Sequence, residues 1–252
     1  MKVKSHSVER TTQMKVIKAS YGKPDNDGDI TVDCEVMVSN STEHDVELVK
    51  ISNMVLNPSG VAINGYCDSE EQVFIEPGSE SKIYVNVPWI NEKQIGGKVT
   101  GSKISVVARL FRQEFHNLGE LEVPKDHHTP TFDKTEVDLG NGVKLYGLIV
   151  YREEPDEDGD ITLGVKAGIR NLSDTLFEKV EMKFSLINQK GAEVDNGETF
   201  VDLRPHSGDF FDANCWNMKA GKLKNTKVKV SLFVHHPVAF LEASQDLQYS
   251  DE

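Results

Sequence analysis

The sequence predicts an all-β protein built from two tandem antiparallel β-sandwiches that arose by internal duplication. A repeat is the first observation: segment 24–60 reappears as segment 155–191, and twelve of the 37 aligned residues are identical. The second observation is that apolar and polar residues alternate along several segments of each repeat, which is the period of a strand with one buried face. The length of 252 residues suits two domains of about 120 residues each.

The alternation is clearest after the Asp-Gly turn that opens each repeat. Every second residue from Ile30 to Val38 is apolar, and the same holds from Ile161 to Ile169. Further alternating segments are expected to form strands at 49–55, 83–89 and 104–110, and at 180–186, 211–215 and 228–234. One buried and one wet face indicates antiparallel sheets. About seven short strands in about 120 residues, without a helical stripe, are typical of an immunoglobulin-like sandwich.

The repeat also predicts the domain boundaries. We place the first sandwich at 1–124, a linker at 125–131 and the second sandwich at 132–252. Residue 1 maps onto residue 132 at the repeat spacing, and Pro124 and Pro130 lie in the intervening segment, together with Lys125 and Asp126. Prolines and charged residues between two periodic segments are typical of a connection.

Composition excludes several classes of protein. The chain has 28 Lys and Arg against 41 Asp and Glu, a formal charge of -13, which is the wrong sign for neutralising nucleic-acid phosphates. No apolar run of about 18 residues is available to cross a membrane, and no signal peptide is visible, so we expect a cytoplasmic protein. The three cysteines, Cys34, Cys67 and Cys215, are too few and odd in number for a disulfide framework. Cys34 and Cys215 fall on apolar phases, where a thiol acts as a small hydrophobe.

Parts of both repeats resemble a known domain family. In the first, Asn40-Ser41 leads to Val49, Leu56-Asn57-Pro58-Ser59-Gly60 and Ile75-Glu76-Pro77-Gly78; in the second, Asn171-Leu172-Ser173 leads to Val180 and Leu186-Ile187-Asn188-Gln189-Lys190-Gly191. This order resembles the FxLYD-type β-sandwich domain over the middle of each repeat, although both repeats lack the aromatic-Leu-Tyr-Asp string. The resemblance implies a sandwich fold and a binding or accessory role, and it brings no catalytic residues with it.

Acidic turns are the first candidate site. Carboxylates stand at alternate positions of both turns: Asp25, Asp27, Asp29, Asp156, Asp158 and Asp160. Such oxygen ligands suit calcium, so a bound Ca²⁺ is one expectation. The other, which we favour, is an exposed hairpin loop in which Asp-Gly forms the turn, because the EF-hand glycine and the bidentate glutamate are missing. The acidic run at Asp68, Glu70 and Glu71 is expected to be a solvated loop.

Histidines and aromatic residues are the remaining candidates. Neighbours along a strand face opposite sides, so His235-His236 is expected to be exposed or capping and not a metal site. Trp89 and Trp216 hold similar places in the repeats, and we expect both in a core or between the domains. Phe111, Phe210 and Phe233 are out of phase with their buried neighbours, so they are expected to point outward and contact a partner.

These observations favour a non-enzymatic interaction, adaptor or assembly protein. Sandwich faces and edge strands can bind another protein, and the negative charge favours a partner with a basic surface over nucleic acid or a membrane. A homo-oligomer is also compatible with this interpretation. Two alternatives stay open: a calcium-binding module that uses the acidic turns, and an enzyme with a site in an interdomain cleft. No nucleophile elbow, phosphate loop or metal motif supports the enzyme, and no cofactor other than Ca²⁺ is expected.

Overall fold

The computed structural model describes residues 12–63, 67–95, 98–133 and 136–250. Nearly all regular structure in these residues is β-strand in antiparallel sheets, and the two helices, α1 (Glu92–Ile95) and α2 (Ala220–Leu223), have one turn each. The predicted all-β fold class is therefore confirmed. Among the residues described, no helix has the length and apolar character needed to cross a membrane.

The chain forms two compact units that differ from the predicted domains. Unit 1 comprises residues 1–113 together with 237–252, and unit 2 comprises residues 114–236. The sequence placed the boundary at 124–132 and assigned all later residues to the second domain. The structure departs from this because the last residues of the chain return to unit 1 and complete its strands. Segment 125–130 is a loop, as expected for a connection, but it lies within unit 2.

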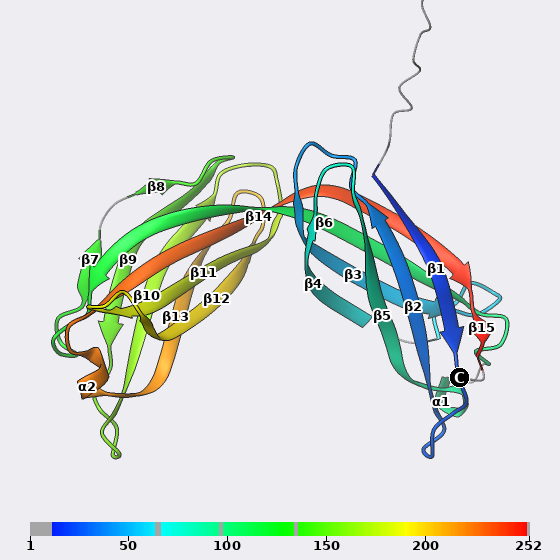
Figure 1. The fold of residues 1–252 in the computed structure, drawn as a ribbon, viewed down its shortest axis with the longest axis horizontal. Coiled ribbons are helices and arrows are strands. Elements are labelled where there is room, and N and C mark those ends of the chain that lie inside the picture. The colour runs from blue at the N-terminus through cyan, green and yellow to red at the C-terminus, as the bar shows by residue number, and fades with distance from the viewer. Residues whose placement is uncertain (1–11, 64–66, 96–97, 134–135, 251–252) are drawn as a thin grey trace, which may run out of the picture. The chain divides into compact units, whose positions relative to one another are not determined.

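Unit 1 contains a four-stranded sheet and part of the six-stranded sheet β12-β11-β14-β6-β3-β4 (Figure 1). The first sheet has the order β15-β1-β2-β5, formed by β15 (Gln248–Tyr249), β1 (Gln13–Tyr21), β2 (Asp29–Ser39) and β5 (Glu80–Asn91). The second contains β4 (Cys67–Ile75), β3 (Val46–Leu56) and the first half of β6 (Lys103–Glu122), followed by the last part of β14 (Thr226–Asp246). β4 and β5 therefore end their sheets.

Unit 2 repeats this order, with the other parts of β6 and β14 and with strands of its own. One sheet has the order β13-β10-β9-β7, formed by β13 (Gly208–Lys219), β10 (Asp160–Asn171), β9 (Val143–Arg152) and β7 (Thr131–Asp133), with β8 (Val137–Asp138) also on β9. The other contains β12 (Glu193–Leu203), β11 (Phe177–Asn188), the first part of β14 and the second half of β6. Strands β12 and β13 thus stand where β4 and β5 stand in unit 1. The duplication itself, a statement about ancestry, stays a prediction.

Each unit encloses one core between its two sheets. In unit 1 the buried cluster joins Val32 of β2 to Ile51 of β3, and in unit 2 it joins Val165 of β10 to Met182 of β11. The residues that alternate in the sequence supply these clusters, because one face of each strand turns inward. Each unit is therefore a two-layer β-sandwich.

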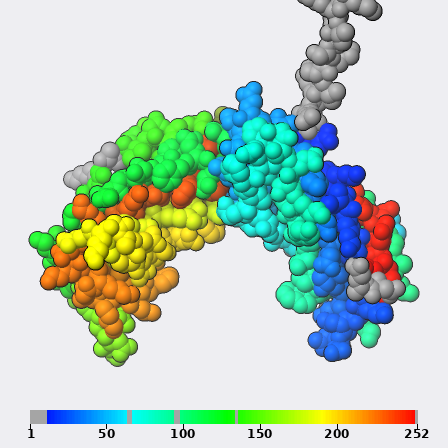
Figure 2. Space-filling model, viewed as in Figure 1, coloured from blue at the N-terminus to red at the C-terminus, as the bar shows by residue number. Residues whose placement is uncertain are grey.

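The C-terminal segment is part of the core of unit 1. Leu247 is buried, and its N–H donates to the carbonyl of Ser102 at 2.9 Å. Strand β15 pairs in parallel with β1, with Ser20 opposite Gln248. Figure 2 shows these last residues, in red, against the blue surface of β1. Without this segment the first sheet would lose its end strand, and the second would lose the strand that flanks β6.

Candidate functional site

The acidic turns are held by their own backbone. Asp25 Oδ1 accepts hydrogen bonds from the N–H groups of Asp27 and Asp29, both at 2.9 Å. Asp156 Oδ1 accepts the same two bonds from Asp158, at 3.0 Å, and Asp160, at 2.8 Å. The first carboxylate of each turn therefore stabilises the hairpin turn by accepting hydrogen bonds from its backbone.

The last carboxylate of each turn also has a partner. Asp29 Oδ1 accepts a hydrogen bond from Asn91 Nδ2 at 2.8 Å, and Asp160 Oδ1 lies 2.6 Å from Lys219 Nζ. In the described part of the chain, no three His, Cys, Asp or Glu side chains lie together as metal ligands. The geometry favours the hairpin interpretation of these six residues, and a bound Ca²⁺ stays an untested prediction.

Of the three phenylalanines predicted to contact a partner, only Phe210 is well exposed. Its side chain is 81% exposed on β13. Phe111 is fully buried, which makes that prediction wrong: it lies directly opposite Leu48 on β3, and Leu48 is also fully buried. Phe233 is half-buried, and its ring centroid lies 5.3 Å from that of Phe115. Strict alternation fails here because both faces of β6 are covered at Leu110 and Phe111.

Both tryptophans were predicted to lie in a core or between the domains, and both are exposed. Trp89 is 80% exposed and Trp216 is 67% exposed. Each lies in a β-bulge, where two residues oppose one: Pro88 and Trp89 stand between the pairs Val87–Val32 and Ile90–Ile30. The extra residue turns the side chain out of the strand's alternation, which is the reason that the phase of the sequence misplaced it.

The exposed aromatic residues gather on the end strands of the sheets. Ten aromatic side chains in the described residues are strongly exposed, and eight of them lie on strands at the ends of the sheet orders: Phe74 on β4, Tyr84 and Trp89 on β5, Phe132 on β7, Phe200 on β12, Phe210 and Trp216 on β13, and Tyr249 on β15. An end strand also presents backbone N–H and C=O groups on its open side. These edges are the candidate interaction sites.

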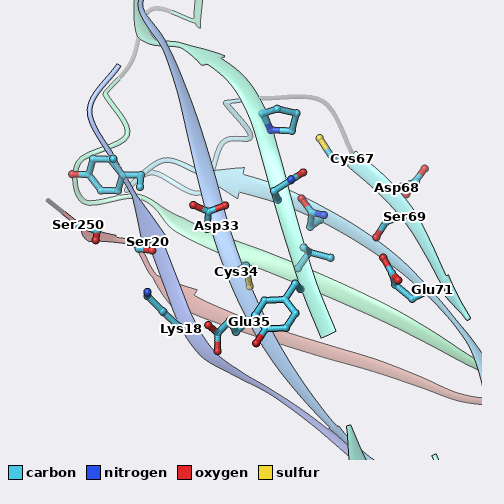
Figure 3. Close-up of a pocket in the computed structure, with 17 residues that line it drawn as sticks. Lys18, Ser20, Asp33, Cys34, Glu35, Cys67, Asp68, Ser69, Glu71 and Ser250 are labelled. Carbon is cyan, nitrogen blue, oxygen red and sulfur yellow. The ribbon is translucent and has the colours of Figure 1, made fainter. Parts of the chain in front are cut away.

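Unit 1 also has a pocket of about 730 Å³ between its outer face and its edge. Figure 3 shows the labelled lining residues in two groups: Lys18, Ser20, Asp33, Cys34 and Glu35 on β1 and β2, with Ser250 near Ser20, and Cys67, Asp68, Ser69 and Glu71 on β4. The acidic run that the sequence placed in a loop is therefore part of a strand. Asn53 of β3 and Asn86 of β5 also line the pocket. We call this feature the unit 1 pocket.

Cys34 and Cys215 are buried, as the sequence predicted. Burial, assisted by Glu35, raises the pKa of the Cys34 thiol from 9.0 to about 12, and burial raises that of Cys215 from 9.0 to about 11. The folded protein thus retains both protons at a pH where the unfolded chain loses them. The free energy of unfolding is therefore unaffected below about pH 9 and falls above it, by about 2 kcal/mol for each thiol at pH 11.

This pH dependence can be measured with a matched variant. Val165 occupies the place of Cys34 in unit 2, and Val87 occupies the place of Cys215 in unit 1. We expect urea denaturation of Cys34→Val/Cys215→Val to show a shallower loss of stability between pH 9 and pH 11 than the unsubstituted chain. Equal slopes for the two proteins would mean that the thiols do not titrate in the unfolding reaction.

His235 and His236 were predicted to be exposed or capping, and both are buried. His236 Nε2 lies 2.9 Å from Glu114 Oε2, and its ring meets the Phe177 ring edge-on at 5.5 Å. The prediction failed because β14 is covered on both faces at this point, as its run of buried residues from Val234 to His236 shows.

Comparisons with known proteins do not identify the chain. No family model and no curated protein matches the sequence. Among solved structures, red sea bream transglutaminase matches with 9% identity and a TM-score of 0.26 over 97% of this chain and 32% of its own. The C-terminal globular domain of oligosaccharyltransferase from Pyrococcus abyssi matches with 12% identity and a TM-score of 0.24 over 94% of this chain and 50% of its own.

A third match is similar in length to the chain. A bacterial adhesin from Mobiluncus mulieris has 10% identity and a TM-score of 0.26, and the match covers 94% of this chain and 97% of the adhesin. The chain spans only about a third of the transglutaminase and half of the oligosaccharyltransferase domain. Similarities with TM-scores this far below 0.5 do not indicate a function for the chain.

Proposed function

We propose that the protein is a non-enzymatic binding protein that accepts an extended segment of a basic partner protein. The segment would bind along the edge of unit 1 at which β4 and β5 end their sheets. One observation carries the proposal: the exposed aromatic side chains lie on the strands that end the sheets, where unpaired backbone groups can bind another strand. Main-chain pairing would supply affinity, and the aromatic side chains would supply contact area.

Charge along this edge favours a basic segment. β4 carries Asp68 and Glu70 on its exposed face and Glu71 on its half-buried face, and the whole chain has a formal charge of -13. A second copy of the chain would bring the same carboxylates to the contact, so repulsion opposes pairing between two such edges. A segment rich in Lys or Arg is attracted instead.

Trp89, on β5 at this edge, combines a strained backbone with an exposed side chain. Its backbone has φ 58°, a left-handed conformation that costs a bulky residue about 1 kcal/mol or more. At the same bulge position, unit 2 has Asn217 with φ 59°, and asparagine adopts this conformation readily. Trp89 is 80% exposed, so it gains little from burial in return. Strain without burial favours a role in contact with a partner.

The substitution Trp89→Asn separates binding from stability. We expect it to raise the free energy of unfolding by about 1 kcal/mol, because it relieves the left-handed strain, and to weaken partner binding. The reverse substitution in unit 2, Asn217→Trp, is the matched control: it should lower stability by a similar amount and leave partner binding unchanged. Urea denaturation measures the first effect.

Binding can be tested with peptides selected from a random library displayed on phage. We expect selection on the unsubstituted chain to enrich peptides in which Lys or Arg alternates with apolar residues, with affinity that falls as salt increases. These peptides should bind Trp89→Asn about ten-fold more weakly. Peptides that bind both proteins equally, or that lack basic residues, would contradict the proposal.

A further inference from the structure

We infer that the unit 1 pocket is a binding site for an aliphatic ammonium group. This inference goes beyond the proposed function and is independent of it, because a small molecule alone can test it. Three features support it: a buried acceptor at the pocket, a cavity that unit 2 fills with its own side chains, and an excess of carboxylates in the lining.

The buried acceptor is Asn53 on β3. Its side chain is 1% exposed and lines the pocket. Within the described residues its Oδ1 has no hydrogen-bond donor, and the same is true of the buried hydroxyl of Ser69, which also lines the pocket. A buried acceptor without a donor costs about 1 kcal/mol or more unless a ligand satisfies it. The pocket therefore needs a group that donates hydrogen bonds.

Unit 2 closes the same place with apolar packing. Asn53 pairs with Cys67 on β4, and the corresponding pair on β11 and β12 is Phe184 with Gly197. Phe184 is fully buried, and a Cβ on Gly197 would lie 2.5 Å from its ring and 2.7 Å from the carbonyl oxygen of Asn214 on β13. Only glycine permits that approach of β12 to β13. Unit 1 has Cys67 there instead, so β4 cannot approach β5 in this way.

A row of residues across β1, β2 and β5 also has smaller or more polar side chains in unit 1 than the corresponding row has in unit 2. Ser20, Asp33 and Asn86 stand side by side on β1, β2 and β5. In unit 2 the corresponding row is Tyr151, Gly164 and Asn214. The Tyr151 ring covers Gly164, where a Cβ would lie 2.3 Å from the ring, and its hydroxyl donates to Asn214 Oδ1 at 2.5 Å. In unit 1 the small Ser20 stands in place of the Tyr151 ring, and Asp33 adds a carboxylate to the lining.

The charges of the lining select a cation. Four carboxylates line the pocket against one lysine, Lys18. Glu35 is paired with Lys82 at 2.9 Å. Asp33, Asp68 and Glu71 take part in no ion pair within the described residues. Ser69 and Glu71 share the half-buried face of β4, about 7 Å apart along the strand. An ammonium group has three donors and no acceptor, which suits the unpartnered Asn53 Oδ1 and Ser69 hydroxyl, and the Glu71 carboxylate further along β4 attracts its positive charge.

The same ammonium chemistry occurs in free polyamines and in lysine side chains. Two probes separate these sources: 1,5-diaminopentane, and lysine blocked at its α-amino and carboxyl groups. Tighter binding of the diamine would assign the site to a polyamine, and tighter binding of the blocked lysine would assign it to a lysine side chain. Either result supports an ammonium site.

The experiment is a titration of the full chain with each probe, in which binding is measured by calorimetry or by changes in amide chemical shifts. Glu71→Gln is expected to weaken binding about ten-fold, because it removes a charged acceptor. Glu70→Gln is the matched control, because it makes the same charge change on the opposite, exposed face of β4, and its binding should stay within about two-fold. Asn53→Phe/Cys67→Gly, which imports the pair found in unit 2, should abolish binding.

The outcomes distinguish a built site from general acidity. Equal weakening by Glu71→Gln and Glu70→Gln, or no saturable binding of either probe, would overturn the inference. Unchanged binding by a folded Asn53→Phe/Cys67→Gly would do the same. Should that double variant fail to fold, the comparison of Glu71→Gln with Glu70→Gln decides alone. Failure of this titration leaves the peptide-binding proposal standing, since that proposal depends on Trp89 and the strand edge.

Discussion

A fragment that ends at residue 124 is expected not to fold, although the sequence delimits it as a complete domain. It lacks residues 237–252, which belong to unit 1. Val238, Ala239, Leu241 and Ala243 pack against the core of that unit, and Leu247 is buried in it. Removing them uncovers apolar side chains in one sheet and takes β15 from the other. Such a loss exceeds the marginal stability of a domain of this size, about 5–15 kcal/mol.

The measurement is the amide NMR spectrum and the cooperativity of thermal unfolding. Two fragments serve as controls. Residues 114–236 form a continuous unit and should fold alone. Residues 1–113 joined to 237–252 through a short Asn-Gly turn should also fold, because β6 and β14 are neighbours in their sheet. A dispersed spectrum and a cooperative transition for fragment 1–124 would show that the C-terminal segment is dispensable.

Replacing Asn171 with alanine is expected to lower the free energy of unfolding by about 3 kcal/mol or more. Asn171 is fully buried. Its Nδ2 donates to the carbonyls of Thr175, at 2.7 Å, and Arg204, at 3.0 Å. Its Oδ1 accepts from the N–H of Ser173 at 2.9 Å and from the Ser173 hydroxyl at 2.7 Å. Alanine would leave this buried set of backbone and hydroxyl groups without partners.

The same effect is expected for Asn40→Ala in unit 1. Asn40 Nδ2 donates to the carbonyls of His44, at 2.8 Å, and Ile75, at 2.7 Å, and its Oδ1 accepts from Thr42. Asn26→Ala, in an exposed turn, is the control and should change stability by no more than about 0.5 kcal/mol. Urea denaturation of the three variants checks the prediction. Losses at Asn40 and Asn171 as small as that at Asn26 would mean that water replaces these hydrogen bonds.

Sequence periodicity predicted the strands well and the surfaces poorly. The alternation from Ile30 to Val38 and from Ile161 to Ile169 matches the buried faces of β2 and β10, because burial on one face imposes a period of two. It failed at Phe111 and His236, where both faces of a strand are covered, and at Trp89, where a bulge shifts the phase. These features depend on neighbouring strands, which alternation along one strand does not record.

No single segment of the sequence indicated the unit 1 pocket. Its lining comes from five strands, and the sequence showed only fragments of it, such as the acidic run from Asp68 to Glu71. The informative signal was a difference between the repeats: Asn53 stands where Phe184 stands at the repeat spacing. A polar residue in place of a core phenylalanine marks the position where one unit is open. The return of residues 237–252 to unit 1 likewise had no local signal, because no turn or composition change sets them apart.

The discontinuity of unit 1 reverses the usual order of events during synthesis. Domains generally complete their folding from the N-terminus as the chain leaves the ribosome. Here the interior unit, residues 114–236, is whole before the ribosome has released the strand that its predecessor needs. Residues 12–113 must therefore wait for residues 237–250, and limited proteolysis of nascent chains of increasing length should find the interior unit protected first.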